Sequence, residues 1–214
     1  MATYSLKLDN ALKKYIDNLS AASRGQLRQL LQQTSSVDRF RLLMNVRGDK
    51  YRGNTGLHIA AISYDLETMK YMFNGFTADQ RYDVVKIQGG GLSALHYAAS
   101  KGFPSIITYL LTDLSQPQKY NLLQLQNKDG ATPLHDAASQ QKPETAQAIL
   151  TSLSLPLLVH LLNIKNNRGQ TVTDIISEAP KLLPGLISQG IVILHMLQLK
   201  YFYSRDTTQC VSVE

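Results

Sequence analysis

The sequence of 214 residues contains a single cysteine, Cys210, and no tryptophan. One thiol cannot form a disulfide within the chain or a thiolate cage around a metal ion, so packing and hydrogen bonds must hold the fold together. Cys210 is the fifth residue from the end, whereas prenylation requires a cysteine at the fourth. This cysteine content is typical of a reducing compartment, and we expect a cytoplasmic protein without a metal site.

Long apolar runs are also missing. Residues 186–203 are rich in apolar side chains, but their longest uninterrupted run, residues 191–194, is far too short to cross a bilayer. Charged residues interrupt the amino end, where a secretory signal would need an apolar core. We therefore expect residues 186–203 to form a terminal cap helix rather than a membrane anchor.

The common catalytic motifs are absent as well. The sequence contains no Gly-x-Ser-x-Gly nucleophile elbow, no phosphate-binding loop and no His-Glu-x-x-His string. The run Gly89-Gly90-Gly91 precedes a Leu-His-x-Ala-Ala string and is typical of a hairpin turn rather than of a phosphate site. We predict that the protein is not an enzyme and has no cofactor and no small-molecule substrate.

What the chain does contain is one pattern written three times, followed by a decayed fourth copy. Self-similarity at a fixed period indicates a stack of equivalent units that can bury their apolar faces only against one another. Arrays of this kind mostly bind other molecules. The copies read GNTGLHIAA at residues 53–61, GLSALHYAA at 91–99, GATPLHDAA at 130–138 and GQTVTDII at 169–176.

The pattern resembles the ankyrin repeat, whose signature is Gly-x-Thr-Pro-Leu-His-x-Ala-Ala followed by a second apolar helix. Second-helix motifs follow the complete copies at residues 67–73, 105–111 and 144–150, and the resemblance extends over residues 53–189. It implies an all-α ankyrin-repeat solenoid with hairpin turns. It also implies a non-catalytic module that binds a partner protein.

Each signature residue has a physical role in such a repeat. The glycine can adopt the positive φ angle of a turn, Thr or Ser can cap the helix, and Pro133 can occupy a first turn without losing a hydrogen bond. The alanine pairs keep one face of the first helix thin, so that neighbouring helices can pack closely. These pairs are residues 60–61, 98–99 and 137–138.

The repeats are longer than usual, because the signature glycines are 38 or 39 residues apart against about 33 in the ankyrin family. The surplus residues are themselves patterned, and they predict an extra short helix in each repeat, with Ser115 and Ser154 at two of the helix starts. In this respect the chain is similar to ankyrin effector proteins of intracellular bacteria, many of which are exported into a host cell. The aligned surplus segments are residues 39–43, 81–85, 119–123 and 158–162.

We expect one monomeric domain over residues 1–214 with helical caps at both ends, because no linker or low-complexity run divides the chain. Two helices, roughly residues 8–19 and 25–33, should precede the first signature, and Pro180 and Pro184 should interrupt the decayed copy. The predicted parts are a helical amino-terminal cap (1–52), three repeats (53–90, 91–129 and 130–168), a degenerate repeat with the carboxy-terminal cap (169–205) and a polar tail (206–214).

Three histidines, His58, His96 and His135, hold the same signature position. Successive repeats are about 8–10 Å apart, whereas zinc needs its nitrogen ligands at about 2 Å, so these side chains cannot share an ion. The resemblance implies that they make hydrogen bonds within and between the turns. His160 and His195 have apolar neighbours in the sequence, and we interpret them as core histidines.

Positive charge is concentrated before the first repeat. Residues 1–52 carry the whole net charge of +6. A solvated helix face explains this pattern, and the alternative is electrostatic binding of anionic lipid or nucleic acid by the basic cap. The ten basic residues are Lys7, Lys13, Lys14, Arg24, Arg28, Arg39, Arg41, Arg47, Lys50 and Arg52.

The resemblance also implies where a protein partner would bind. Ankyrin domains contact partners through the hairpin tips and the exposed edge of the first helix, on the concave face. Tyr51, Arg52 and Tyr64 are the first candidates, because Tyr and Arg are common anchors at interfaces; alternatively, Tyr51 packs across its own hairpin. The predicted contacts are Tyr51, Arg52, Asn54, Ser63, Tyr64, Leu92, Ser100, Lys101, Lys128, Asp129, Gln140 and Arg168.

Overall fold

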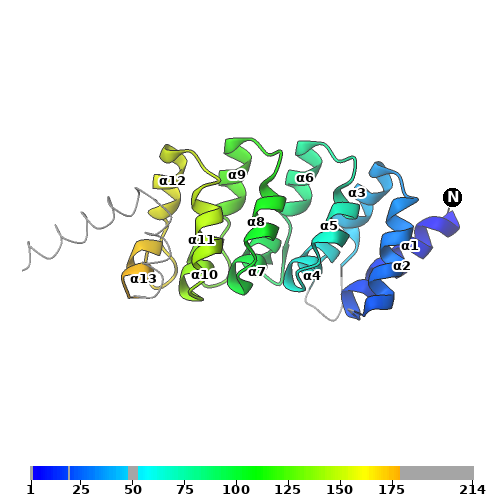
Figure 1. The fold of residues 1–214 in the computed structure, drawn as a ribbon, viewed down its shortest axis with the longest axis horizontal. Helices are drawn as coiled ribbons and strands as arrows, with labels where there is room; N and C mark the ends of the chain where they lie inside the picture. Colours follow the sequence, from blue (N-terminus) through cyan, green and yellow to red (C-terminus); the bar gives the residue numbers. More distant parts are fainter. Residues whose placement is uncertain (1, 19, 48–52, 179–214) are drawn as a thin grey trace, which may run out of the picture.

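A computed structural model of the chain describes residues 2–18, 20–47 and 53–178 (Figure 1). In this part of the chain short helices stack side by side into an elongated array of four units with three helices each, followed by the first helix of a fifth unit. The expected all-α solenoid is therefore confirmed, and each of these four units has the expected extra helix.

In the three units after the first, the helices lie in three layers, which Figure 1 shows from the lower to the upper edge of the array. The first helices are α1 (Ala2–Asp17), α4 (Gly56–Ile62), α7 (Ala94–Lys101), α10 (Pro133–Ser139) and α13 (Val172–Glu178). The second helices are α2 (Ala21–Gln32), α5 (Leu66–Phe73), α8 (Pro104–Leu111) and α11 (Pro143–Leu150). The third helices are α3 (Ser36–Asn45), α6 (Ala78–Val85), α9 (Gln116–Leu123) and α12 (Leu155–Leu162).

The first helices begin as the signature predicts. Ser93 and Thr132 are the N-cap residues of α7 and α10, and each side chain accepts a hydrogen bond from the backbone three residues on. Pro133 occupies the first turn of α10. All three alanine pairs are fully buried, so the first helices of adjacent units approach closely and share a continuous core with Leu57, Leu95 and Leu134.

Glycine forms the turns before these helices. Strand β1 (Gln88–Gly89) pairs with β2 (Leu92–Ser93), and the two residues between them, Gly90 and Gly91, have φ angles of 61° and 90°. Positive φ at both central residues is the geometry of a tight hairpin turn, so the glycine run is the hairpin that the sequence predicts.

The third helices form a layer of their own. Ser115 and Ser154 are the N-cap residues of α9 and α12, as predicted. Side chains connect successive members of this layer: Gln118 Nε2 donates to Asp79 Oδ1 at 2.8 Å. Gln116 Oε1 accepts a bond from the backbone N–H of Ser154 at 2.7 Å. The added helices therefore contribute contacts between units.

Arginine side chains of the third helices also donate hydrogen bonds to carbonyl groups at the carboxyl ends of second helices. The guanidinium of Arg39 donates to the carbonyl oxygen of Leu31 at 2.8 Å and to that of Asn74 in the next unit. Arg81, at the equivalent position, donates to the carbonyl of Tyr109 at 2.7 Å and lies over the rings of Phe73 and Tyr109, 4.7 Å and 5.0 Å from their centroids. Both side chains are nearly buried and satisfy carbonyls that a helix end leaves free.

The helix boundaries predicted for the amino-terminal cap are wrong. Helix α1 covers Ala2–Asp17 instead of residues 8–19, and α2 begins at Ala21 instead of residue 25. The reason is Ser20, which caps α2 in a reciprocal arrangement with Ser23 and so starts the helix four residues earlier.

One histidine was also misplaced, because His160 is exposed on α12 rather than in the core. The α12 side chains that reach the core are Leu158, Leu161 and Leu162. No helix within the described ranges is both long and apolar enough to span a bilayer. The predicted cap helix 186–203, Pro180, Pro184, His195, Cys210 and the tail 206–214 lie outside the described residues.

Candidate protein-interaction face

The signature histidines tie each unit to the next. The backbone N–H groups of Thr55, Ser93 and Thr132 donate to Nδ1 of the histidine three residues on, at 3.1, 3.1 and 3.3 Å. Because Nδ1 accepts, we assign the ring proton to Nε2, which can then donate across the unit boundary. The carbonyl oxygens of Leu92, Ala131 and Gln170 lie 3.1, 3.1 and 3.2 Å from Nε2 of His58, His96 and His135, and at His58 the backbone N of Gly89 also lies 3.2 Å from Nε2.

These imidazoles are neutral at physiological pH. Burial lowers the pKa of His58 and of His96 to about 4, and it lowers the pKa of His135 as well. Both ring nitrogens are already engaged, so the hydrogen-bonding role implied by the resemblance is confirmed. Among the described residues no three His, Cys, Asp or Glu side chains come together in a way that could hold a metal ion.

The turns before successive first helices are bonded in line. Gln88 Nε2 donates to the carbonyl of Gln126 at 3.1 Å, and Gln126 Nε2 donates to the carbonyl of Lys165 at 3.0 Å. Asn167 Nδ2 donates to the carbonyl of Lys128 at 3.0 Å. This edge of the array is therefore a row of turns fixed relative to one another, from which exposed side chains project.

The connections between first and second helices repeat one backbone conformation. Tyr64, Gly102 and Gln141 all have positive φ, at 57°, 81° and 53°. Tyr64 is 53% exposed, yet its ring lies 4.8 Å from that of Phe103 and its hydroxyl accepts a bond from Ser105 Oγ at 3.0 Å. The next unit thus holds a large exposed aromatic side chain in one orientation.

The structure describes ten of the twelve predicted contact residues, and most are accessible. Tyr51 and Arg52 lie outside the described residues. The exposed ones are Tyr64, Lys101, Lys128, Asp129, Gln140 and Arg168, and the half-buried ones are Ser63, Leu92 and Ser100.

Asn54 requires a correction, because it is only 4% exposed rather than available at a hairpin tip. Its Nδ2 donates to the hydroxyl of Tyr97 in the next unit at 3.3 Å. The side chain packs against Gly89, where a Cβ atom would collide with Asn54 Oδ1. Asn54 therefore joins two units instead of facing a partner.

Two residues that the sequence reasoning missed follow the signature histidine directly. Tyr97 is half-buried, and its ring meets that of His58 edge to face with 6.0 Å between centroids. Asp136 is also half-buried; burial, and then the charge of Asp129, raise its pKa to about 7. The signal was available, since this signature position varies between repeats (Ile59, Tyr97, Asp136).

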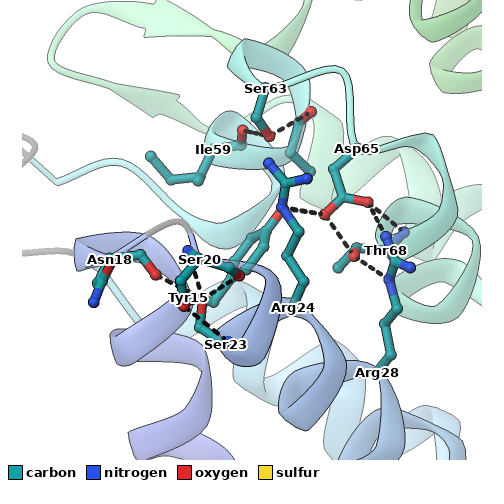
Figure 2. A network of polar contacts seen from close by, with 11 residues as sticks. Tyr15, Asn18, Ser20, Ser23, Arg24, Arg28, Ile59, Ser63, Asp65 and Thr68 are labelled. Carbon is teal, nitrogen blue, oxygen red and sulfur yellow. Dashed lines mark hydrogen bonds and ion pairs between the residues drawn. The ribbon is translucent and has the colours of Figure 1, made fainter.

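Arginines of the amino-terminal unit converge on a single carboxylate, as Figure 2 shows. The Asp65 side chain is 2% exposed and pairs with Arg28, with Arg24 at 3.6 Å, and with the hydroxyl of Tyr15, which donates at 3.1 Å. Burial alone would raise the pKa of Asp65, but hydrogen bonds from Thr68 and Arg28 outweigh it and hold the pKa below its usual value. The cluster connects α1 and α2 to the start of α5.

Fewer basic side chains of the amino-terminal cap are therefore available to bind a ligand than the sequence suggests. Arg24 and Arg28 pair with Asp65, Arg39 caps helix ends, and Arg47 donates to the carbonyl of Val46 at 3.2 Å. Structural contacts of four arginines reduce the charge available for anionic lipid or nucleic acid. The exposed basic residues in the described part of the cap are Lys7, Lys13, Lys14 and Arg41.

Comparison with known proteins agrees with this geometry. A family model described as ankyrin repeats (3 copies) matches residues 19–121 and, in a second overlapping match, residues 57–156. No curated protein matches the chain significantly. The family matches include the second and third helices of the amino-terminal unit, which lacks the signature string. The matches span more than half of the chain, which therefore belongs to the ankyrin-repeat family, whose repeats are generally protein–protein interaction modules.

Proposed function

We propose that this protein is a non-catalytic interaction module, and that it binds a partner protein through its hairpin tips and the exposed edge of its first helices, including the residues at their carboxyl ends. We call this surface the hairpin face. In the described residues it consists of Ser63, Tyr64, Leu92, Tyr97, Ser100, Lys101, Lys128, Asp129, Asp136, Gln140 and Arg168. The main observation behind this proposal is that Tyr64 is exposed, yet Phe103 and Ser105 hold it in one orientation.

The hairpin face is preorganised, and this favours binding of a partner. A partner that binds flexible side chains must order them, at about 0.5–1.5 kcal/mol for each long side chain. Here Tyr64 is already oriented, and bonds such as Gln88 to Gln126 fix the spacing between turns. A large, partly exposed aromatic side chain is also a common anchor residue at protein interfaces.

The chemistry of the face supports binding rather than catalysis. The imidazoles next to it are neutral and use both nitrogens within the fold, so none is poised to move a proton. The exposed side chains are of mixed type and include Lys101, Lys128 and Asp129. Such a pattern suits a folded protein surface with complementary charges.

Our finer proposal concerns the partner. The lengthened repeat is similar to that of ankyrin effectors of intracellular bacteria, which supports a host protein as the partner and the host cytoplasm as the place of action. The protein then acts as a monomeric scaffold whose activity is binding.

The test is affinity capture from host-cell lysate with charge-reversed variants. Lys101→Glu with Lys128→Glu changes two exposed residues of the hairpin face. We expect the amount of a specifically captured protein to fall about tenfold, as the loss of two interface contacts predicts, with an unchanged Tm.

The matched control reverses two exposed charges in the layer of third helices, Arg41→Glu on α3 with Lys86→Glu at the end of α6. It should capture the same protein as the parent chain. Equal loss of capture in both variants would show that overall charge, rather than the hairpin face, attracts the partner. Full capture by Lys101→Glu with Lys128→Glu would place the contact elsewhere.

A further inference from the structure

We infer that the amino-terminal unit of the array carries a second binding site, a groove between α1 and α2 that takes an acidic peptide segment. This site is separate from the hairpin face. The groove has a volume of about 500 Å³. Its walls are Lys7, Asn10, Ala11 and Lys14 of α1 and Gln26, Gln29, Leu30 and Gln33 of α2.

The groove lies beside the face that α1 buries against the array. On α1 the buried Leu8, Leu12 and Tyr15 form the inner side, and Leu12 lies against Gly56 of the next unit. Lys7 and Lys14 lie on a flank of the same helix, next to Ala11, and are exposed. Figure 1 shows α1 and α2 at the end of the array, with no described helix beyond them.

Charge defines the ligand class. Lys7 and Lys14 form no ion pair with any residue the structure describes, and no carboxylate lines the groove. The two lysines are two helical turns apart, or about 10 Å along the axis. In an extended peptide the side chains of residues two or four apart lie on one face, about 7 or 13 Å apart, and the long lysine side chains can reach carboxylates at either spacing.

The other walls suit a peptide backbone. Asn10, Gln26 and Gln29 are exposed amides, which donate and accept hydrogen bonds as peptide groups require. Ala11 and Leu30 provide a small apolar floor. Bound single-stranded nucleic acid would need aromatic side chains for stacking, and the described residues that line the groove include none.

The experiment uses the full chain and a fluorescent hexaglutamate peptide, with hexaglutamine as the uncharged probe, in a polarisation assay at low salt. Hexaglutamate should bind and hexaglutamine should not. Lys7→Gln with Lys14→Gln should weaken hexaglutamate binding about fivefold or more, from the loss of two charge contacts.

The matched control removes two exposed charges of the same unit outside the groove, Lys13→Gln with Arg41→Gln. It should change hexaglutamate binding less than about twofold. Equal weakening by both pairs would mean diffuse attraction and would overturn the site. Binding of hexaglutamine, or no binding of hexaglutamate, would overturn it as well.

Two further measurements keep the proposal testable if the lysine variant loses stability. Gln29→Glu puts a carboxylate into the groove wall and should weaken hexaglutamate binding without altering a lysine. Vesicles of phosphatidylserine and phosphatidylcholine, and an oligothymidylate, should bind the parent chain and the Lys7→Gln, Lys14→Gln variant equally. Loss of vesicle or oligonucleotide binding in that variant, with hexaglutamate binding unchanged, would replace the peptide by that other partner.

Discussion

His96 Nε2 donates a hydrogen bond to the carbonyl oxygen of Ala131 in the following repeat, 3.1 Å away. Nδ1 of the same ring accepts from the backbone N–H of Ser93 at 3.1 Å. The side chain is fully buried, so it satisfies two backbone groups that water cannot reach. One imidazole thus fixes a turn in its own repeat and holds the next one in place.

His96→Leu should therefore destabilise the protein by about 3 kcal/mol, because it leaves a buried donor and a buried acceptor without partners. Urea unfolding followed by circular dichroism measures this loss. The matched control is His160→Leu, at an exposed position, which should change the free energy of unfolding by less than about 0.5 kcal/mol. A His96→Leu chain as stable as the parent would show that the bond to Ala131 contributes nothing.

Stability should decrease in mild acid. The folded pKa of His58 and of His96 is about 4, below the ordinary value of 6.5, so the unfolded chain binds protons first as the pH falls. The stabilisation is complete above pH 6.5 and is lost as the pH falls toward 4. Urea unfolding across this range tests it, and a free energy of unfolding that does not change with pH would contradict neutral histidines in the folded state.

Asp136 should respond to pH in the opposite direction. Its folded pKa is raised from 3.8 to about 7, so its contribution to stability is complete below 3.8 and is lost as the pH rises through 7. Asp136→Asn should raise the free energy of unfolding at pH 8 and change it little at pH 4. The same variant removes this opposing titration from the histidine measurement. Equal effects at both pH values would mean that Asp136 titrates normally.

Asp65→Ala should cost about 2 kcal/mol, since it leaves Arg28 and the Tyr15 hydroxyl without their acceptor. Protection from hydrogen exchange should fall most in α1 and α2, which the carboxylate connects to α5. The control is Glu67→Gln, two residues away, whose carboxylate is exposed and pairs only with Lys70 in the described structure. That change should cost less than about 0.5 kcal/mol, and a similar cost for both variants would remove the special role of Asp65.

Local chemistry made most of the fold predictable. The signature glycines, the caps Ser93 and Thr132, and the starts of the third helices at Ser115 and Ser154 depend on residues a few positions apart, and all are in place. Ser20 and Ser23 carry the same kind of signal, and reading it would have placed the start of α2 correctly.

Contacts over long separations were not predictable in this way. The Asp65 carboxylate accepts a hydrogen bond from Tyr15, which is 50 residues away in the sequence. Arg39 donates to the carbonyl oxygen of Asn74, which is 35 residues away. From its charge alone Arg39 was therefore expected on a solvated surface, although its side chain is buried in the fold. The prediction that Asn54 faces a partner protein was wrong for a related reason: its hydrogen-bond partner, Tyr97, belongs to another repeat.

Bonds between repeats join residues at nearly constant separations: 38 residues from Gln88 to Gln126, and 39 from Gln126 to Lys165 and from Asp79 to Gln118. A duplicated stretch of that length, inserted between two repeats, would present the same donors and acceptors to both neighbours. Duplication or deletion of whole repeats could therefore lengthen or shorten the array while its junctions kept their geometry. The reach of the molecule toward a partner could evolve by such steps without redesign of the core.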